Sequence, residues 1–123
     1  MLCGFASGQV VLCCGGRDYR GVSCVRRVLS SLWAQGYRVV VHGAARGADQ
    51  LCGEVASELG FAVVAVAADW ARFGRSAGCR RNQAMLGLGV GLVVAFPGGS
   101  GTADMVRRAR GAGVRVCLVG GAL

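Results

Sequence analysis

Residues 90–102 have the sequence VGLVVAFPGGSGT, and this stretch decides the fold class. A continuous apolar run of this length is typical of a β-strand that is buried on both faces of a sheet. Pro97 then breaks the strand, and the glycines after it form a turn that leads into a predicted helix over residues 102–111. The local unit is therefore an apolar strand, a glycine-rich turn and a helix.

The same unit is repeated along the chain without an intervening linker. Because near-continuous apolar strands alternate with helices, we expect an α/β protein with a three-layer, Rossmann-like parallel sheet of about five strands and helices on both faces, in a single domain over residues 1–123. The longest turn, residues 69–78, is expected to be an ordered, functional loop. The other strands are predicted at 9–14, 37–41, 61–68 and 114–119, and the other helices at 22–33, 51–59 and 79–88.

The composition excludes several classes of protein. Of 123 residues, 54% are hydrophobic and 16% are charged, which is too apolar for a disordered chain. No apolar run approaches the roughly 20 residues of a membrane-spanning helix, and no basic and apolar leader precedes the first strand. We therefore expect a soluble, cytoplasmic protein with no membrane partner and with room for one site.

The seven cysteines are expected to be free thiols rather than disulfides, because their number is odd and no export signal is present. Cys13, Cys14 and Cys117 lie in predicted strands, whereas Cys24 and Cys52 lie on apolar helix faces, so burial is expected. A structural zinc site is disfavoured because the chain has one histidine and no second cysteine pair. No metal and no other cofactor is predicted.

The net charge of +8 comes from 14 arginines, because the chain contains no lysine. A bias of this kind can reflect a GC-rich genome, in which case the arginines only solvate exposed faces. It can equally indicate an anionic partner, since the planar guanidinium donates paired hydrogen bonds to phosphate. The positions of the arginines decide between the two interpretations.

The carboxyl ends of parallel strands meet at one edge of a sheet, where ligands of Rossmann-like domains bind. Residues 97–102, PGGSGT, are predicted to bind phosphate at this edge. The glycines let backbone N–H groups approach an anion, the N-terminus of the following helix is electropositive, and Ser100 and Thr102 add hydroxyl donors. The alternative is a tight turn that only needs a positive φ. The motif is neither GxGxxG nor a P-loop.

The other loops at this edge combine glycine with charged and aromatic side chains. Arg46 is placed to meet phosphate, and Asp49 can either accept ribose hydroxyls or hold Arg46. Asp18 can cap a helix instead of binding a ligand, Tyr19 can stack on a base or ribose, and His42 can be a neutral core residue or a functional one. The predicted ligand-binding residues are Gly15, Gly16, Arg17, Asp18, Tyr19, Gly43, Arg46, Gly47, Asp49, Asp69, Trp70, Arg75, Arg81, Asn82, Pro97, Gly98, Gly99, Ser100, Gly101 and Thr102.

The loop motifs together resemble the YspA-like, YpsA-related branch of the SLOG superfamily over nearly the whole chain. The resemblance implies a Rossmann-like domain that binds nucleotides or their derivatives. It also implies a relation to the DprA DNA-processing proteins and the LOG phosphoribohydrolases, in a superfamily often found in phage and bacterial conflict systems. The motifs are GRDY at 16–19, HGAARGAD at 42–49, ADW at 68–70 with Arg75, AG at 77–78, RN at 81–82 and FPGGSGTAD at 96–104.

One departure from the LOG motif bears on catalysis. The LOG enzymes carry a catalytic glutamate three residues after the threonine that corresponds to Thr102, and this chain has Met105 there. A thioether cannot transfer a proton, and the adjacent Asp104 lies about 100° further around the helix. No catalytic residue is therefore assigned and an enzymatic role is disfavoured. The loop aspartates Asp18, Asp49 and Asp69 remain candidate acids or bases, and each can instead be a helix cap or an arginine partner.

Three functions are consistent with these features. The first is a binding module for a phosphorylated nucleoside derivative (a nucleotide, an ADP-ribose-like molecule or a cyclic-nucleotide signal), acting by sequestration as a phage sponge against an immune signal. The second is a LOG-like hydrolase of the nucleotide N-glycosidic bond, and the third is DprA-like nucleic-acid binding, favoured only by the net charge. A homo-oligomer is also expected, because apolar helix faces with Val22 and Trp33, or with Met85 and Leu88, can exceed what a small sheet covers.

Overall fold

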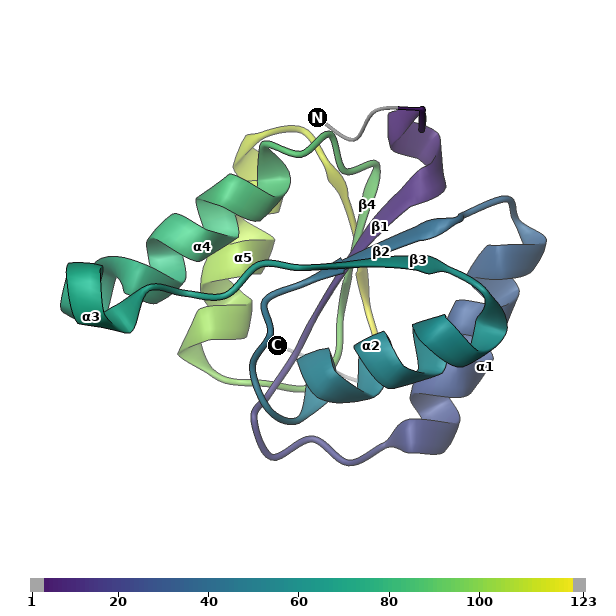
Figure 1. The fold of residues 1–123 in the computed structure, drawn as a ribbon, viewed down its shortest axis with the longest axis horizontal. Helices are drawn as coiled ribbons and strands as arrows, with labels where there is room; N and C mark the ends of the chain where they lie inside the picture. The colour runs from purple at the N-terminus through teal and green to yellow at the C-terminus, as the bar shows by residue number, and fades with distance from the viewer. Residues whose placement is uncertain (1–3, 121–123) are drawn as a thin grey trace.

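The computed structural model describes residues 4–120, which form one parallel β-sheet between two layers of helices (Figure 1). The sheet has the strand order β3-β2-β1-β4-β5, and every neighbouring pair is parallel. This architecture confirms the predicted α/β, Rossmann-like fold class. The strands are β1 (Val10–Cys14), β2 (Val39–His42), β3 (Ala62–Ala65), β4 (Leu92–Ala95) and β5 (Arg115–Leu118).

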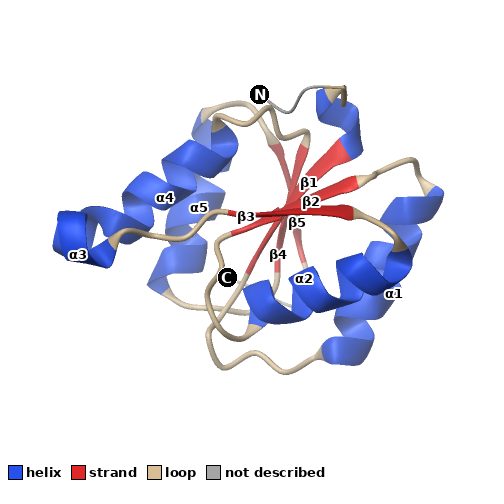
Figure 2. Ribbon diagram, viewed as in Figure 1, coloured by secondary structure: helices blue, strands red, loops and turns tan. Residues whose placement is uncertain are grey.

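Long helices cover both faces of the sheet (Figure 2). The helices α1 (Val22–Ala34) and α2 (Ala48–Leu59) pack on one face, and α4 (Ala77–Leu86) and α5 (Ser100–Gly111) pack on the other. A short 3-10 helix, η1 (Ser7–Gln9), precedes β1. Within residues 4–120, no helix combines the length and the apolar character that crossing a bilayer requires.

The continuous apolar runs of the central strands are explained by burial on both faces of the sheet. Successive side chains of a strand point to opposite faces. Val11 and Val40 therefore join the core beneath α1 and α2, whereas Leu12 and Val93 join the core beneath α4 and α5. All four side chains are fully buried. For β1, β2 and β4, the inference from apolar runs to helices on both faces is confirmed.

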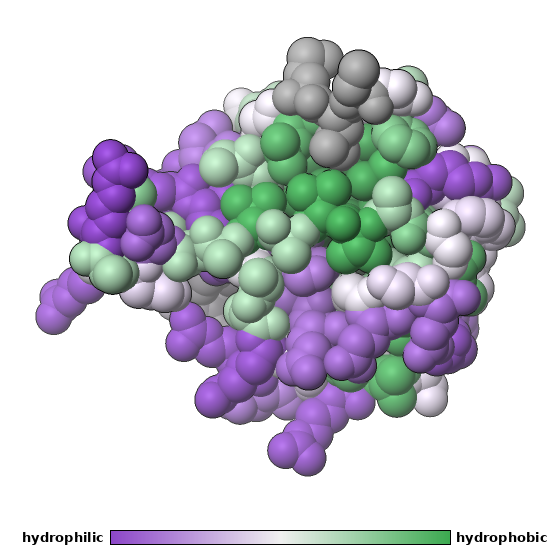
Figure 3. Space-filling model, viewed as in Figure 1, coloured by the Kyte–Doolittle hydropathy of each residue, from purple (hydrophilic) through white to green (hydrophobic). Residues whose placement is uncertain are grey.

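The two edge strands depart from this pattern. Residues of β3 and β5 are half-buried or exposed, because each of these strands has a neighbour on one side only. Apolar surface accordingly gathers over the edge at which β3 lies (Figure 3). The strand predicted over 61–68 ends at Ala65, and Cys117 in β5 is exposed, so its expected burial is wrong. An apolar run alone does not distinguish an edge strand from a central one.

Residues 69–78, predicted as one long loop, contain a short helix α3 (Trp70–Phe73) and a 3-10 helix η2 (Gly74–Ser76), and α4 begins at Ala77. The carboxylate of Asp69 caps α3 by accepting the N–H of Arg72 at 3.1 Å. The prediction of a continuous loop is therefore wrong. An aspartate at an N-cap position was the local pattern that pointed to the helix.

Candidate functional site

Three crossover loops at the carboxyl edge of the sheet are joined through one residue, Gly16. Its N–H donates to the carbonyl of Pro97 at 2.8 Å, and its carbonyl accepts the N–H of Ala48 at 3.0 Å. These bonds connect the loop after β1 with the loop after β4 and with the first residue of α2. The strand order explains the contacts, because β1 lies between β2 and β4.

Several of the predicted ligand glycines are needed for this close packing. A Cβ on Gly16 would lie 2.9 Å from the carbonyl oxygen of Pro97. Gly47 has a φ of 79°, and a Cβ there would meet the carbonyl of Gly16. These glycines therefore serve the packing of one loop on another, whether or not a ligand is bound. The same confinement, with a Cβ contact below 3.0 Å, applies to Gly15, Gly43 and Gly98.

The first turn of α5 leaves backbone donors available. The N–H of Ala103 donates to the carbonyl of Gly99 at 3.0 Å, whereas the N–H groups of Gly99, Ser100 and Gly101 have no hydrogen-bond acceptor within residues 4–120. A Cβ on Gly99 or Gly101 would meet no atom within 4 Å, so there is open space on the side-chain side of these two residues. Thr102, predicted to add a hydroxyl, is buried. An open helix N-terminus of this kind is suited to an anion.

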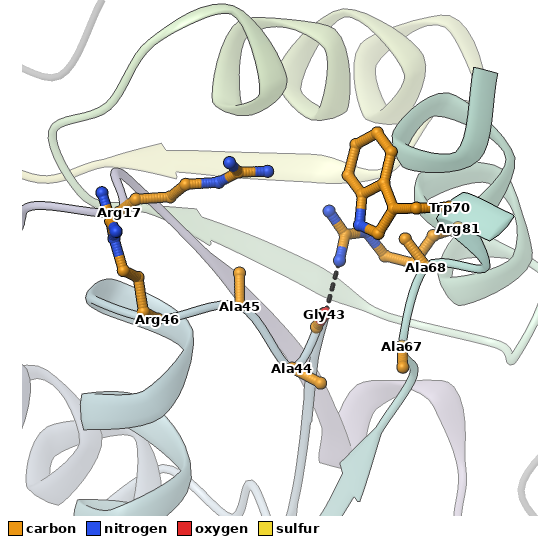
Figure 4. A pocket seen from close by; sticks show the side chains of 9 residues that line it. All are labelled: Arg17, Gly43, Ala44, Ala45, Arg46, Ala67, Ala68, Trp70 and Arg81. Carbon is orange, nitrogen blue, oxygen red and sulfur yellow. Dashed lines mark hydrogen bonds between the residues drawn. The ribbon is translucent and has the colours of Figure 1, made fainter. Parts of the chain in front are cut away.

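A pocket of about 370 Å³ lies over the carboxyl ends of β1, β2 and β3 (Figure 4). Arg17 extends across it toward Trp70, and its guanidinium carbon lies 5.8 Å from the centroid of the Trp70 ring. The guanidinium of Arg81 reaches the pocket from α4, and Trp70 is half exposed. The lining residues are Arg17, Gly43, Ala44, Ala45, Arg46, Ala67, Ala68, Trp70 and Arg81.

The pocket brings together five residues predicted from the sequence: Arg17, Gly43, Arg46, Trp70 and Arg81. It does not include the PGGSGT motif at 97–102, which was predicted to bind phosphate at the same edge of the sheet. The motif and the pocket are neighbours instead, because the loop after β1 contacts residue 97 and also contributes to the lining. The four lining alanines were not among the predicted ligand residues, although Ala44, Ala45 and Ala68 lie within the HGAARGAD and ADW motifs, because a methyl group carries no recognisable chemistry.

Arg81 is held at the pocket by the chain itself. Its guanidinium donates to the carbonyl of Gly43, and its Nε is buried without a hydrogen-bond partner in the described part of the chain. A Cβ at position 43 would lie 2.7 Å from the guanidinium carbon, so a larger residue there would displace the end of the Arg81 side chain. One donor of this guanidinium is therefore unused, which is uncommon for a buried polar atom.

Two buried side chains hold the loop at 43–46. Nδ1 of His42 accepts the N–H of Ala44 at 3.0 Å, and the carboxylate of Asp49 accepts the N–H of Ala45 at 3.2 Å. Burial lowers the pKa of His42, and burial raises the pKa of Asp49. Both side chains position the loop, and neither is among the residues that line the pocket.

Arg46 pairs with Asp18, at 3.3 Å between Nη2 and Oδ1, and the sequence-based alternative in which Asp49 holds Arg46 is wrong. The side chains of Arg46 and Asp18 are 70% and 94% exposed. An ion pair this exposed contributes little to stability. The guanidinium can therefore turn from Asp18 to a ligand at small cost.

Three further predicted residues lie outside the pocket. Tyr19 packs on Phe96 with 5.4 Å between the ring centroids, so one face of its ring is occupied, and burial raises the pKa of Tyr19 to about 12. Asp69 caps α3, and Arg75 is exposed in η2. Within residues 4–120, no three His, Cys, Asp or Glu side chains gather as a metal site would require.

Asn82, another predicted ligand residue, connects α4 with α5. It is buried and donates to the carboxylate of Asp104 at 2.9 Å and to the carbonyl of Gly101 at 3.3 Å. Although burial acts in the opposite direction, hydrogen bonds from Asn82 and Arg108 lower the pKa of Asp104. Met105, at the position of the LOG glutamate, is fully buried in the apolar core beneath α5. Asn82 thus fixes the first turn of α5 from behind.

Two comparisons with known proteins bear on this site. A family model described as the YspA, cpYpsA-related SLOG family matches residues 9–73, which is more than half of the chain and extends from η1 to α3. The chain is also similar to the Gene 61 protein of Mycobacterium phage D29, with 40% identity over 89 residues that cover 67% of this chain and 71% of the relative. The span matched by the family model includes Arg17, Arg46 and Trp70.

Proposed function

The chain belongs to the YspA, cpYpsA-related SLOG family, whose members are associated in general with nucleotide derivatives, and on this premise we propose that it binds a phosphorylated nucleoside derivative at the carboxyl edge of its sheet. The candidate ligands are a nucleotide, an ADP-ribose-like molecule and a cyclic-nucleotide signal. The proposed contacts are the pocket side chains Arg17, Arg46, Trp70 and Arg81 and the open amides at the start of α5.

One observation carries this proposal: three guanidinium groups meet at a pocket whose lining contains no carboxylate. Arg17 comes from the loop after β1, Arg46 from the loop after β2, and Arg81 from α4. Arg46 is paired with the exposed Asp18, whereas Arg17 and Arg81 form no ion pair within residues 4–120. The positive charge at the pocket is therefore only partly balanced, and a phosphorylated ligand can balance it through charge-assisted hydrogen bonds. An excess of arginine that is only compositional would instead spread over solvated faces.

The neighbouring features support a nucleotide rather than a simple anion. The open N–H groups of Gly99, Ser100 and Gly101 stand at a helix N-terminus, where phosphate is favoured. Trp70 is half exposed and offers a planar surface on which a base can stack. Charge and an aromatic face are thus available at the same edge of the sheet.

The carboxylates support binding without turnover. Cleavage of an N-glycosidic bond needs a group that transfers a proton at the substrate. Asp18 is paired with an arginine, Asp49 accepts a loop N–H, and Asp69 caps α3. None of the three is a lining residue of the pocket. We therefore propose that a bound ligand is kept intact and that the protein acts by sequestration, a role consistent with a phage relative.

The first test is made on protein purified from cells and then denatured, with any released small molecule identified by mass spectrometry. We expect a phosphorylated nucleoside derivative. Arg17→Gln and Arg46→Gln should carry less of it. The matched control is Arg110→Gln, which removes the same charge from an exposed position in the last turn of α5 and should carry as much as the parent protein.

A second assay separates binding from hydrolysis. The protein is incubated with nucleoside monophosphates and with NAD, and free base is measured by chromatography. Ligand that binds and is recovered intact supports sequestration, whereas continuous release of base would establish a LOG-like hydrolase instead. If no nucleotide binds and the protein has a DNA affinity that falls steeply with salt, the proposal is wrong and DprA-like binding replaces it.

A further inference from the structure

We propose that the pocket is a second anion site, separate from the N-terminus of α5, and that the ligand therefore carries two phosphoryl groups. This inference rests on the proposed function and narrows the ligand class from any phosphorylated nucleoside to one with two phosphoryl groups. It follows from the hydrogen-bond donors in the pocket, from the fixed position of the Arg81 guanidinium, and from the separation between the pocket and the PGGSGT motif.

Every polar side chain that lines the pocket can only donate hydrogen bonds. Arg17, Arg46 and Arg81 present guanidinium N–H groups, and Trp70 presents an indole N–H. The remaining lining residues are glycine and alanine, and the carbonyl of Gly43 is already taken by Arg81. The lining side chains therefore offer no acceptor to ribose hydroxyls or to the amino groups of bases, which would depend on backbone carbonyls here. Phosphoryl oxygens, which only accept, match this set of groups.

Arg81 is fixed in place at this position by the chain itself. The bond from its guanidinium to the carbonyl of Gly43 holds the group at the wall of the pocket, where Arg81 is one of the lining residues. Figure 4 shows Arg81 and Trp70 on one side of the pocket and Arg17 extending toward Trp70 from the other, with 5.8 Å between the guanidinium carbon of Arg17 and the centroid of the Trp70 ring. A phosphoryl group between them would meet donors from two sides.

The pocket and the first turn of α5 are two places rather than one. Residues 97–102 contribute nothing to the lining of the pocket. The loop after β1 connects the two places, because Gly16 binds Pro97 and the next residue, Arg17, crosses the pocket. A ligand that lies across this loop can place one phosphoryl group at the amides of Gly99 to Gly101 and the other in the pocket.

The test is an NMR titration of the amide groups with inorganic phosphate, which needs no knowledge of the base, against sodium chloride at equal ionic strength. We expect two groups of amide shifts, at 99–101 and at 43–46, that saturate independently. Arg46→Gln should weaken phosphate binding at 43–46 by about tenfold, the effect of losing roughly one charge-assisted contact, and leave 99–101 unchanged. Gly101→Asp, an acid in an open first turn that the helix tolerates, should do the reverse.

A second arm compares adenosine 5′-monophosphate with adenosine 3′,5′-bisphosphate by calorimetry. The bisphosphate should bind at least about tenfold more tightly, and Arg46→Gln should remove most of that advantage while Arg110→Gln keeps it. Phosphate shifts confined to 99–101, or equal affinities for the two nucleotides, would overturn the second site and leave the proposed function standing. Shifts at both places without binding of any nucleotide would overturn the proposed function and leave the second anion site standing.

Discussion

His42 and Ala44 are joined by a hydrogen bond in which Nδ1 of the imidazole accepts the N–H of Ala44 at 3.0 Å, and Ala44 lies in the left-handed region with a φ of 58°. An accepting Nδ1 carries no proton, so the bond requires a neutral imidazole. The conformation of a loop that lines the arginine pocket therefore depends on the charge state of a buried side chain.

We expect stability to fall on mild acidification through His42. Burial lowers the pKa of His42 in the folded state, whereas the unfolded value is about 6.5. The unfolded chain therefore takes up the proton first, so the stabilisation is present above pH about 6.5 and is lost as the pH falls through the lower folded pKa. Urea denaturation at pH 7.5 and 5.5 should show a larger loss for the parent protein than for His42→Gln. Equal losses would contradict this role of the imidazole.

Replacing the left-handed alanine should stabilise the protein. A residue other than glycine in this region costs roughly 1–2 kcal/mol, and this cost disappears in the glycine variant. Glycine also has more backbone freedom in the unfolded chain, and this reduces the gain by about 0.5–1 kcal/mol. Ala44→Gly should therefore raise the free energy of unfolding by about 0.5–1 kcal/mol. Ala45→Gly, at the next position and with no positive φ, is the control and should lower it. A loss of stability in Ala44→Gly would show that the loop does not adopt this conformation.

Adding a methyl group at the junction of the three loops should destabilise the fold. Gly16→Ala places a Cβ 2.9 Å from the carbonyl oxygen of Pro97, and overpacking of this kind costs about 1–3 kcal/mol. Gly101→Ala adds the same methyl group where no atom lies within 4 Å and should be neutral or slightly stabilising. Chemical denaturation of both variants checks the contrast, and similar stabilities would mean that the loops are not packed as described.

Restoring the LOG glutamate should not create an enzyme. Met105 is fully buried among apolar side chains, so Met105→Glu buries a carboxyl without a partner and should lower stability by about 3 kcal/mol or more. Met105→Leu keeps the apolar contacts and should cost less than about 1.5 kcal/mol. Both are compared by thermal denaturation and by release of base from nucleoside monophosphates. A stable Met105→Glu protein that cleaves nucleotides would refute this assignment of the side chain to the core.

The fold class could be predicted because its cause is local: apolar runs, glycine-rich turns and helical spacing each report on their own segment. The predictions that were wrong concern features that depend on neighbours in space rather than in sequence. Whether Cys117 is buried is decided by the absence of a second neighbour for β5, and nothing in the run 114–119 records that absence. The short helix after Asp69 was missed because capping was only one of several roles open to this aspartate, and the pattern of residues 69–78 did not decide between them.

Only part of the candidate site could be predicted from the sequence in the same way. The loops could be assigned to one edge of the sheet because parallel strands share their direction, and five predicted residues do line one pocket. The partner of each side chain could not be predicted. Arg46 forms an ion pair with Asp18, Asn82 donates a hydrogen bond to Asp104, and the ring of Tyr19 packs on that of Phe96. Each choice is set by distances between loops that are far apart in the sequence.

The two hydrogen bonds that join Gly16 to the neighbouring loops restrict how this site can evolve. Because one residue gives its N–H to one adjoining crossover and its carbonyl to another, an insertion or deletion in any of the three would displace the other two. Relatives that recognise different molecules are therefore expected to conserve the lengths of these three loops. They should differ instead in the side chains that line the pocket, so that ligand selectivity changes by single substitutions while the backbone keeps its dimensions.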